Sequence, residues 1–214
     1  MSGQKRITIL FASESKNKYE EIKKYIDTIP NVTIELVKSS REIYEIQSMN
    51  REEIIYEKLN DVYKDLIYSH FLKKFDETVE EHWIMVEDTS FCIEKMGGFP
   101  GPFIKYYLNS LPLAKIVEQN CGSAAESIFS IGVCKLSSEL KLLNSLLVFE
   151  GIVKGVIANG VCGKNGFGYD SIFIPYTDDN KEMKTYAEFT MDEKNKLNAR
   201  ILAVEKFMKY LKLA

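Results

Sequence analysis

Apolar and polar positions in the first forty residues predict a strand, a helix and a second strand. Residues 7–11 form a short, β-branched apolar run that is typical of a buried strand. The polar stretch after it leads into a helix that should reach about Thr28, with Ile22 and Ile26 at helical spacing. Residues 32–37 then alternate as a second strand. A strand–helix–strand opening of this kind builds a parallel or mixed sheet.

The middle of the chain predicts a long helix, a strand and a tight turn. Residues 51–75 carry apolar side chains on one helical face. The charged and aromatic stretch 61–82 has no Gly or Pro, so we expect it to extend that helix. A buried strand at 83–86 should end at the polar residues 87–89. The Gly-Gly-Phe-Pro-Gly-Pro run at 97–102 is the strongest turn signal of the chain.

The second half predicts further strands and a closing helix. Residues 127–136 and 145–157 are expected to form long antiparallel strands, and residues 171–174 a short one. Thr190 has capping-box spacing at the start of the last helix, and Asn198 offers a second start. No repeat or linker interrupts the pattern, which therefore predicts an α/β fold in one domain without a separate linker.

Composition narrows the class of protein. The 214 residues are 45% hydrophobic and 28% charged, as in ordinary globular proteins. A net charge of -3 argues against a nucleic acid polymer or an anionic membrane as partner. No apolar run approaches the roughly 20 residues that span a bilayer, and the first residues lack a signal-peptide pattern. Four cysteines without a Cys-x-x-Cys pair argue against a zinc site and suit a reducing compartment, so we expect a cytoplasmic protein.

Carboxylates and lysines dominate the residues that could carry chemistry. The sequence has neither a Gly-x-Ser-x-Gly elbow nor a Walker phosphate loop, and its two histidines lie in the polar 61–82 stretch. Carboxylate chemistry with a metal and nearby lysines remains. Asp88 is the sharpest candidate, because it should follow a buried strand, where open α/β sheets place their ligand sites. The alternative is a simple capping role.

Two segments are candidates for holding phosphate. Ser13, Ser15 and Lys18 lie at the first strand-to-helix junction, where hydroxyl and amide groups can bind a phosphate. The turn at 97–102 should lead into a helix that carries Lys105, and its glycines let the backbone approach a ligand closely. The alternatives are N-capping at the first segment and a solvated surface turn at the second.

Two further segments are candidates for contacting a base. Phe167 and Asp170 follow Gly166 in a glycine-rich loop, where an aromatic ring can stack on a base and a carboxylate can bond its edge. Lys194 and Arg200 lie near the start of the last helix, and on a continuous helix both would be angled toward the protein body. The alternatives are core aromatic residues and a solvated helix face.

Taken together and in this order, the motifs resemble the inosine triphosphate pyrophosphatase family. Val86-Glu87-Asp88-Thr89 looks very like the family's Val-Glu-Asp-Thr segment, and the turn at 97–105 looks like its Gly-Gly-x-Pro-Gly-Pro-Tyr-Ile-Lys element. The opening segment 11–18, the Gly-Phe-Gly-Tyr-Asp loop at 166–170 and the closing segment 185–200 resemble further family elements. The resemblance spans nearly the whole chain.

The resemblance implies an elongated, two-lobed mixed sheet flanked by helices, with a central nucleotide cleft, in a homodimer. The implied reaction is Mg²⁺-dependent hydrolysis of non-standard purine nucleoside triphosphates (ITP, dITP, XTP) to the monophosphate and pyrophosphate, which cleanses the nucleotide pool. It implies that Asp88 is catalytic and that Glu45 and Asp88 hold the metal. The implied phosphate-binding residues are Ser13, Ser15, Lys18, Lys58, Lys105 and Lys194, and the implied base-binding residues are Phe167, Asp170 and Arg200.

The sequence departs from the family pattern at three places. Ser15 stands where the family usually has Asn, and Asn198-Ala199-Arg200 where it usually has Ser-His-Arg. The segment after Lys58 is longer than usual. The missing imidazole normally helps to recognise a 6-oxo purine, so we expect a weaker preference for inosine and xanthine. Two alternatives stay open: a pyrophosphatase of another base specificity, as in the related Maf-like proteins, and a nucleotide-binding module without catalysis.

Overall fold

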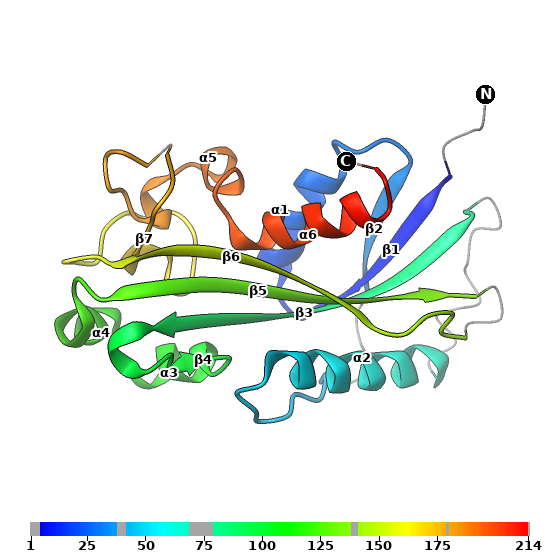
Figure 1. Ribbon diagram of the computed structural model, residues 1–214, viewed down its shortest axis with the longest axis horizontal. Helices are drawn as coiled ribbons and strands as arrows, with labels where there is room; N and C mark the ends of the chain where they lie inside the picture. The colour runs from blue at the N-terminus through cyan, green and yellow to red at the C-terminus, as the bar shows by residue number, and fades with distance from the viewer. Residues whose placement is uncertain (1–4, 38–41, 69–78, 138–140, 179, 214) are drawn as a thin grey trace. The chain divides into compact units, whose positions relative to one another are not determined.

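The computed structural model describes residues 5–37, 42–68, 79–137, 141–178 and 180–213, and within them the chain forms a mixed α/β fold (Figure 1). Strands in the order β2-β1-β3-β5-β6-β7 make one seven-stranded sheet, in which β4 pairs with β3. The strands are β1 (Ile7–Ala12), β2 (Val32–Val37), β3 (Glu81–Ile93), β4 (Pro100–Gly101), β5 (Ala124–Leu136), β6 (Leu147–Ile157) and β7 (Phe173–Pro175). The helices are α1 (Lys16–Ile26), α2 (Arg51–Tyr68), α3 (Ile104–Ser110), α4 (Leu113–Asn120), α5 (Met191–Asn195) and α6 (Ala199–Tyr210).

Strand pairing confirms the mixed sheet that the sequence predicts. β1 pairs in parallel with β2 and with β3, whereas β6 pairs antiparallel with β7. All six residues of β1 are buried, and all but Thr8 are apolar, as expected for a strand inside the sheet. β2 lies at the edge of the sheet and begins with alternating buried and exposed residues, so only one of its faces packs against the core.

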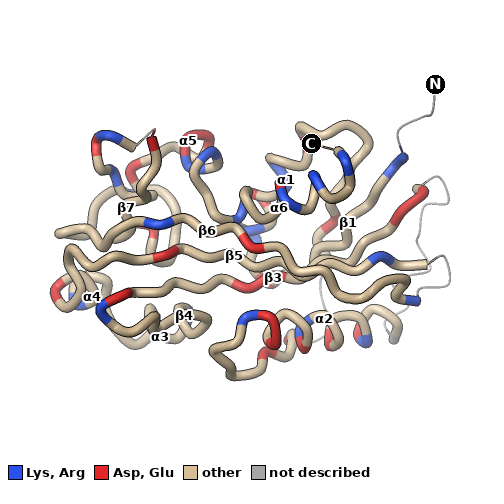
Figure 2. The backbone as a smooth tube through the Cα atoms, in the orientation of Figure 1, with Lys and Arg blue, Asp and Glu red and all other residues tan. Residues whose placement is uncertain are grey.

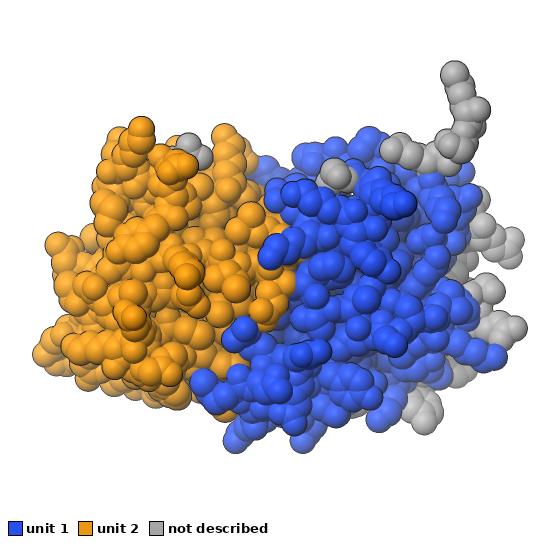
Figure 3. All heavy atoms as spheres, viewed as in Figure 1, with its two compact units in different colours: residues 1–88, 130–149, 204–214 blue, residues 89–129, 150–203 orange. Residues whose placement is uncertain are grey.

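The chain divides into two compact units (Figure 3). Unit 1 comprises residues 1–88, 130–149 and 204–214, and unit 2 comprises residues 89–129 and 150–203. Strands β3, β5 and β6 contribute residues to both units, and the division in β3 falls after Asp88. The expected single domain with a central nucleotide cleft between two lobes stays a prediction.

Unit 1 buries side chains on both faces of its strands. Figure 1 shows α2 on one face, with α1 and the end of α6 on the other. On the α2 side, Leu59 and Val62 belong to one apolar cluster with Ile84 of β3. On the other side, Trp83 meets the ring of Phe207 edge-on at 5.2 Å. Because neighbouring residues of a strand point to opposite faces, β3 supplies the core on both sides of the sheet.

Unit 2 has an aromatic core and one very close backbone contact. The rings of Phe91 and Tyr169 stack at 4.1 Å, and Phe173 meets both edge-on. At Gly151 of β6 the backbone runs against the first turn of α6, so a Cβ atom there would lie 1.8 Å from the carbonyl oxygen of Ala199. Only glycine leaves room for this approach.

The structure corrects two predicted boundaries around β3. The strand does not end at residues 87–89 but continues to Ile93, because nearby lysines offset the charges of Glu87 and Asp88 inside the sheet. The predicted helical stretch 61–82 is wrong at its end, since β3 already begins at Glu81. Residues 69–78 of that stretch lie outside the described residues.

The predicted C-terminal restart is confirmed. Thr190 caps α5 through a capping box with Glu193, and α6 begins after Asn198. The short strand expected at 171–174 forms two residues later, because a 3₁₀ turn occupies residues 170–172. In the part of the chain that the structure describes, no helix has the length and apolar character that crossing a bilayer would require.

Candidate active site

Unit 1 brings together six polar residues, one of which is Asp88, and we call this group the Asp88 cluster. The end of β1 supplies Ser13, the first turn of α1 supplies Lys18, and α2 supplies Lys58. β3 supplies two neighbouring carboxylates, and the segment before α2 supplies a third. The cluster consists of Ser13, Lys18, Glu45, Lys58, Glu87 and Asp88.

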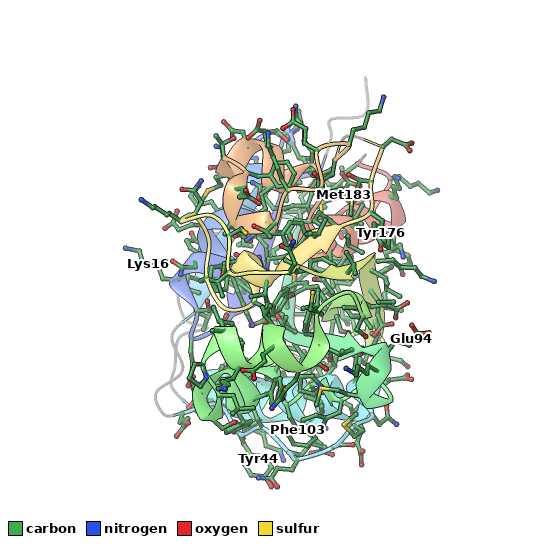
Figure 4. All side chains as sticks on the ribbon, turned by 90° about the vertical axis from the view of Figure 1, so that its left-hand side faces the viewer. Lys16, Tyr44, Glu94, Phe103, Tyr176 and Met183 are labelled. Carbon is green, nitrogen blue, oxygen red and sulfur yellow. The ribbon has the colours of Figure 1, made fainter. Side chains whose placement is uncertain are left out.

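The junction between β1 and α1 fixes one side of the cluster. Ser15 is the N-cap of α1, and its hydroxyl accepts from the amide of Lys18 at 3.4 Å. The Ser13 hydroxyl donates to Glu87 Oε1 at 3.0 Å and accepts from the amide of Ser15 at 3.1 Å. The Lys18 ammonium pairs with Glu87 Oε2 at 2.7 Å, whereas Lys16, two residues earlier, is exposed and points outward (Figure 4). The helix start therefore turns one lysine into the cluster.

Lys58 is a buried ammonium held between two acceptors. Its Nζ donates to the carbonyl oxygen of Glu87 at 2.8 Å and pairs with Glu45 Oε1 at 2.7 Å. Burial by itself would lower the pKa of Lys58, but the charges of Glu87, Glu45 and Asp88 outweigh it and raise the pKa above its ordinary value. Lys58 therefore stays positively charged at physiological pH.

Asp88 and Glu87 are neighbours in sequence with opposite protonation behaviour. Burial raises the pKa of Asp88 to about 6, partly offset by Lys58 and reinforced by the charge of Glu87. Glu87 is more deeply buried, yet Lys18 and Lys58 hold its pKa below the ordinary value. Among the described residues, no hydrogen-bond donor reaches the buried Asp88 Oδ2. A carboxylate that changes charge near neutral pH and keeps an oxygen available is suited to accept a proton.

The charges of the cluster fit a divalent cation. Two ammonium groups face three carboxylates, so the cluster alone is not positive enough to gather a polyanion. Within the described ranges, no three His, Cys, Asp or Glu side chains form a ready metal cage. Mg²⁺ usually needs only one or two protein carboxylates and takes its other ligands from phosphates and water. Glu45 and the available oxygen of Asp88 meet that requirement.

Unit 2 contains a second group, the Phe167 cluster, which consists of Phe167, Asp170, Lys194 and Arg200. The Lys194 ammonium pairs with Asp170 Oδ2 at 2.7 Å, and both side chains are buried. The same oxygen accepts from the amide of Phe167 at 2.8 Å, which fixes the glycine-rich loop. Lys194 Nζ also lies 5.1 Å from the centre of the Phe167 ring. The cation of Lys194 therefore lies against both the carboxylate of Asp170 and the half-buried ring of Phe167.

Arg200 completes this cluster from the start of α6. Asn198 Oδ1 accepts from the amide of Arg200 at 3.0 Å, so the helix restart fixes the backbone of this residue. The guanidinium lies 4.8 Å from the centre of the Phe129 ring and 5.7 Å from that of Phe167. Burial lowers the pKa of Arg200 to about 9, which still leaves it charged at neutral pH. The group can only donate hydrogen bonds.

The predicted site residues fall into these two groups with two exceptions, Ser15 and Lys105. Ser15 is the N-cap of α1, and its amide donates to the Ser13 hydroxyl of the Asp88 cluster. Lys105 is exposed on α3, after the turn at 97–102, and belongs to unit 2. Lys194, a predicted phosphate ligand, lies with the base-binding candidates in unit 2. Glu87 was not among the predicted site residues, although it lies beside Asp88 in the sequence. Only the fold shows that Ser13, Lys18 and Lys58 all bond to it.

Comparisons with known proteins agree with the motifs. The model of the Ham1 family matches residues 9–210. The chain is 32% identical over 205 residues to a dITP/XTP pyrophosphatase of Pyrococcus horikoshii, covering 96% of this chain and 97% of that protein. It is 30% identical over 207 residues to a dITP/XTP pyrophosphatase of Methanopyrus kandleri, covering 95% and 96%. The solved structure of a HAM1 protein from Coxiella burnetii has a similar fold, with a TM-score of 0.71 and 22% identity over 97% of this chain and all of that one.

Proposed function

The chain belongs to the Ham1 family, and on that premise we propose that it is a nucleoside triphosphate pyrophosphatase. Its substrates would be non-standard purine nucleotides such as ITP, dITP and XTP, which it would cut to the monophosphate and pyrophosphate. Two relatives named dITP/XTP pyrophosphatase, which match this chain over nearly their whole length, support this proposal. The observation that carries it is Asp88, a half-buried carboxyl beside two lysines, which has a pKa of about 6 and an oxygen that no hydrogen-bond donor of the described residues reaches.

In the proposed reaction, Asp88 accepts a proton from the attacking water. The water oxygen forms a bond to the α-phosphorus, and the bond from this phosphorus to the bridging oxygen breaks. The electron pair leaves with pyrophosphate. Because Lys58 is buried and fixed, its charge is already in place when negative charge develops on the phosphates. Lys18 adds a second charge, which Glu87 orients.

Mg²⁺ is part of the proposal. Bound by Glu45 and Asp88 together with substrate phosphates, it would neutralise charge and acidify a bound water. The substrate carries about four negative charges, which two lysines beside three carboxylates do not balance. Removing Mg²⁺ should therefore abolish turnover.

The Phe167 cluster is the proposed base site. Phe167 would stack on the base, and Arg200, which can only donate, would favour a 6-oxo acceptor over the 6-amino group of adenine. Asp170 would bond the base edge while paired with Lys194. Ser13, Ser15, Lys105 and Lys194 are the further proposed phosphate contacts.

Pyrophosphate release from ITP, XTP, dITP, GTP and ATP, with and without Mg²⁺, tests the proposal. We expect release from ITP, XTP and dITP only with Mg²⁺, and Asp88→Asn should lower kcat on the order of 10²-fold or more. Equal rates on ITP and ATP would favour the alternative of a different base specificity, which the buried Ala199 makes relevant. Nucleotide binding without pyrophosphate release would instead indicate a non-catalytic module.

We also infer that the protein works as a cytoplasmic homodimer. None of its four cysteines, all of which lie in the described part of the chain, forms a disulfide bond, which is consistent with a reducing compartment. The homodimer follows only from the family resemblance. Light scattering during size-exclusion chromatography would test it, because a single species at the 24.6 kDa chain mass would contradict it.

A further inference from the structure

Unit 1 contains a pocket that is separate from the Asp88 cluster. It has a volume of about 740 Å³, and its lining includes Lys5, Glu81, Trp83, Lys135, Tyr210 and Lys212. Glu81 and Asp88 are both in β3, seven residues apart. At about 3.3 Å per residue, this places them about 23 Å apart along the strand. The proposed reaction therefore makes no use of this pocket.

A buried carboxylate organises the charged part of the pocket. Glu81 accepts from Lys5 Nζ at 2.9 Å and from the indole Nε1 of Trp83 at 3.3 Å, and it pairs with Lys135 Nζ at 2.9 Å. Burial alone would raise the pKa of Glu81, but these three donors hold it below the ordinary value. An ammonium has three donor hydrogens, and the bond to Glu81 uses one on each lysine. The carboxylate thus fixes two cations at the pocket wall.

Lys212 adds a third cation from an unusual backbone position. It follows α6 with φ of 60°, in the left-handed region where helices normally place glycine. The amide of Lys212 donates to the carbonyl oxygen of Lys209 at 3.0 Å, and the amide of Leu213 donates to the carbonyl oxygen of Met208 at 3.0 Å. These two bonds form the Schellman motif, which usually has glycine at the position of Lys212. A lysine there strains the backbone, yet its side chain lines the pocket. Residues that break a local rule in this way are expected at functional sites.

The rest of the wall is aromatic and apolar. Trp83 and Tyr210 meet edge-on with ring centres 6.4 Å apart, and Tyr210 remains 53% exposed. Leu143 is 57% exposed on the same pocket. An open aromatic ring beside cations offers a stacking surface next to an anion site. Figure 2 marks acidic residues at the start of β3 and basic residues in the chain after α6, and both segments contribute residues to the pocket lining.

We propose that this pocket binds a small phosphate monoester that carries a flat ring, such as a nucleoside monophosphate. Three ammonium groups and one carboxylate leave two positive charges, which match a dianionic phosphate. Lysines, as adaptable point charges, suit a tetrahedral phosphate, whereas a planar carboxylate is better matched by arginine. The volume lies within the range of roughly 300–1,000 Å³ that is typical of small-molecule sites. The inference does not depend on the proposed catalytic function.

Trp83 allows a direct test, because it is the only tryptophan in the chain and lines the pocket. The full-length protein, without Mg²⁺, would be titrated with IMP, inorganic phosphate and inosine while the emission of Trp83 is followed. We expect a saturable change with IMP, weaker binding of phosphate and inosine, and the same IMP titration in Asp88→Asn. An unchanged emission with IMP would overturn the proposal.

Lys212→Gly is the matched variant. Glycine suits φ of 60°, so this variant should fold at least as well as the wild type, but its affinity for IMP should fall roughly tenfold through the lost charged contact. Lys209→Ala, an exposed change on the same helix end, is the control and should bind IMP like the wild type. Equal IMP affinity in Lys212→Gly and the wild type would overturn the proposal. The titration reads Trp83 and not pyrophosphate, so its outcome is independent of the catalytic assay.

Discussion

Replacing Asp88 by Asn should stabilise the folded protein although it slows catalysis. The folded protein raises the pKa of Asp88 from its ordinary value of 3.8 to about 6, so keeping this carboxylate ionised in the folded state is unfavourable. That difference corresponds to at most about 3 kcal/mol at 1.36 kcal/mol per pH unit. Asparagine has the same shape and no charge. Partial solvent access to Asp88 reduces this gain. At pH 8 we expect the free energy of unfolding of Asp88→Asn to be about 1–3 kcal/mol higher than that of the wild type.

The pH dependence distinguishes this explanation from a general packing effect. A carboxyl with a raised folded pKa contributes stability that is fully present below its unfolded pKa and is lost as the pH rises through its folded pKa. The advantage of Asp88→Asn should therefore be largest above about pH 7 and vanish near pH 4. Urea unfolding at both pH values, without Mg²⁺ or nucleotide, measures the two differences. An equal difference at both pH values, or a less stable variant at pH 8, would refute the reasoning.

Three further predictions concern Asp88, Glu87 and Gly151. If Asp88 is the base, kcat/KM should rise tenfold per pH unit below about 6 and level off above it, and a flat profile from pH 5 to 8 would exclude that role. Glu87→Gln should move this midpoint to lower pH, because the charge of Glu87 raises the pKa of Asp88; an unchanged midpoint would contradict the coupling. Gly151→Ala should lower the free energy of unfolding by about 1–3 kcal/mol or more, measured in urea, because its Cβ would meet Ala199 at 1.8 Å; full stability would show that β6 can move away.

Local patterns in the sequence were sufficient to predict most of the fold. The mostly apolar run of β1, the alternation in β2 and the capping box at Thr190 each depend on neighbouring residues only, and each is confirmed. The course of β3 beyond Val86 depends on distant residues. Glu87 and Asp88 look like the polar end of a strand until Lys18 and Lys58, from two helices, supply the opposite charge.

The sequence predicted most residues of the candidate site, but it did not predict which of them bond to one another. Motif order predicted Asp88, Glu45 and Lys58, but no local signal shows that Glu87 receives three hydrogen bonds. The sequence likewise gave no reason to place Lys194 against Asp170 and Phe167 instead of among the phosphate candidates. These pairings depend on contacts between residues far apart in the sequence, which sequence spacing does not determine.

Hydrolysis of ITP in ¹⁸O-labelled water, with Mg²⁺ present, tests the central claim most directly. If water readied by Asp88 attacks the α-phosphorus, mass spectrometry will find one ¹⁸O atom in IMP and none in the released pyrophosphate. Label in the pyrophosphate, or release of orthophosphate in its place, would contradict the account.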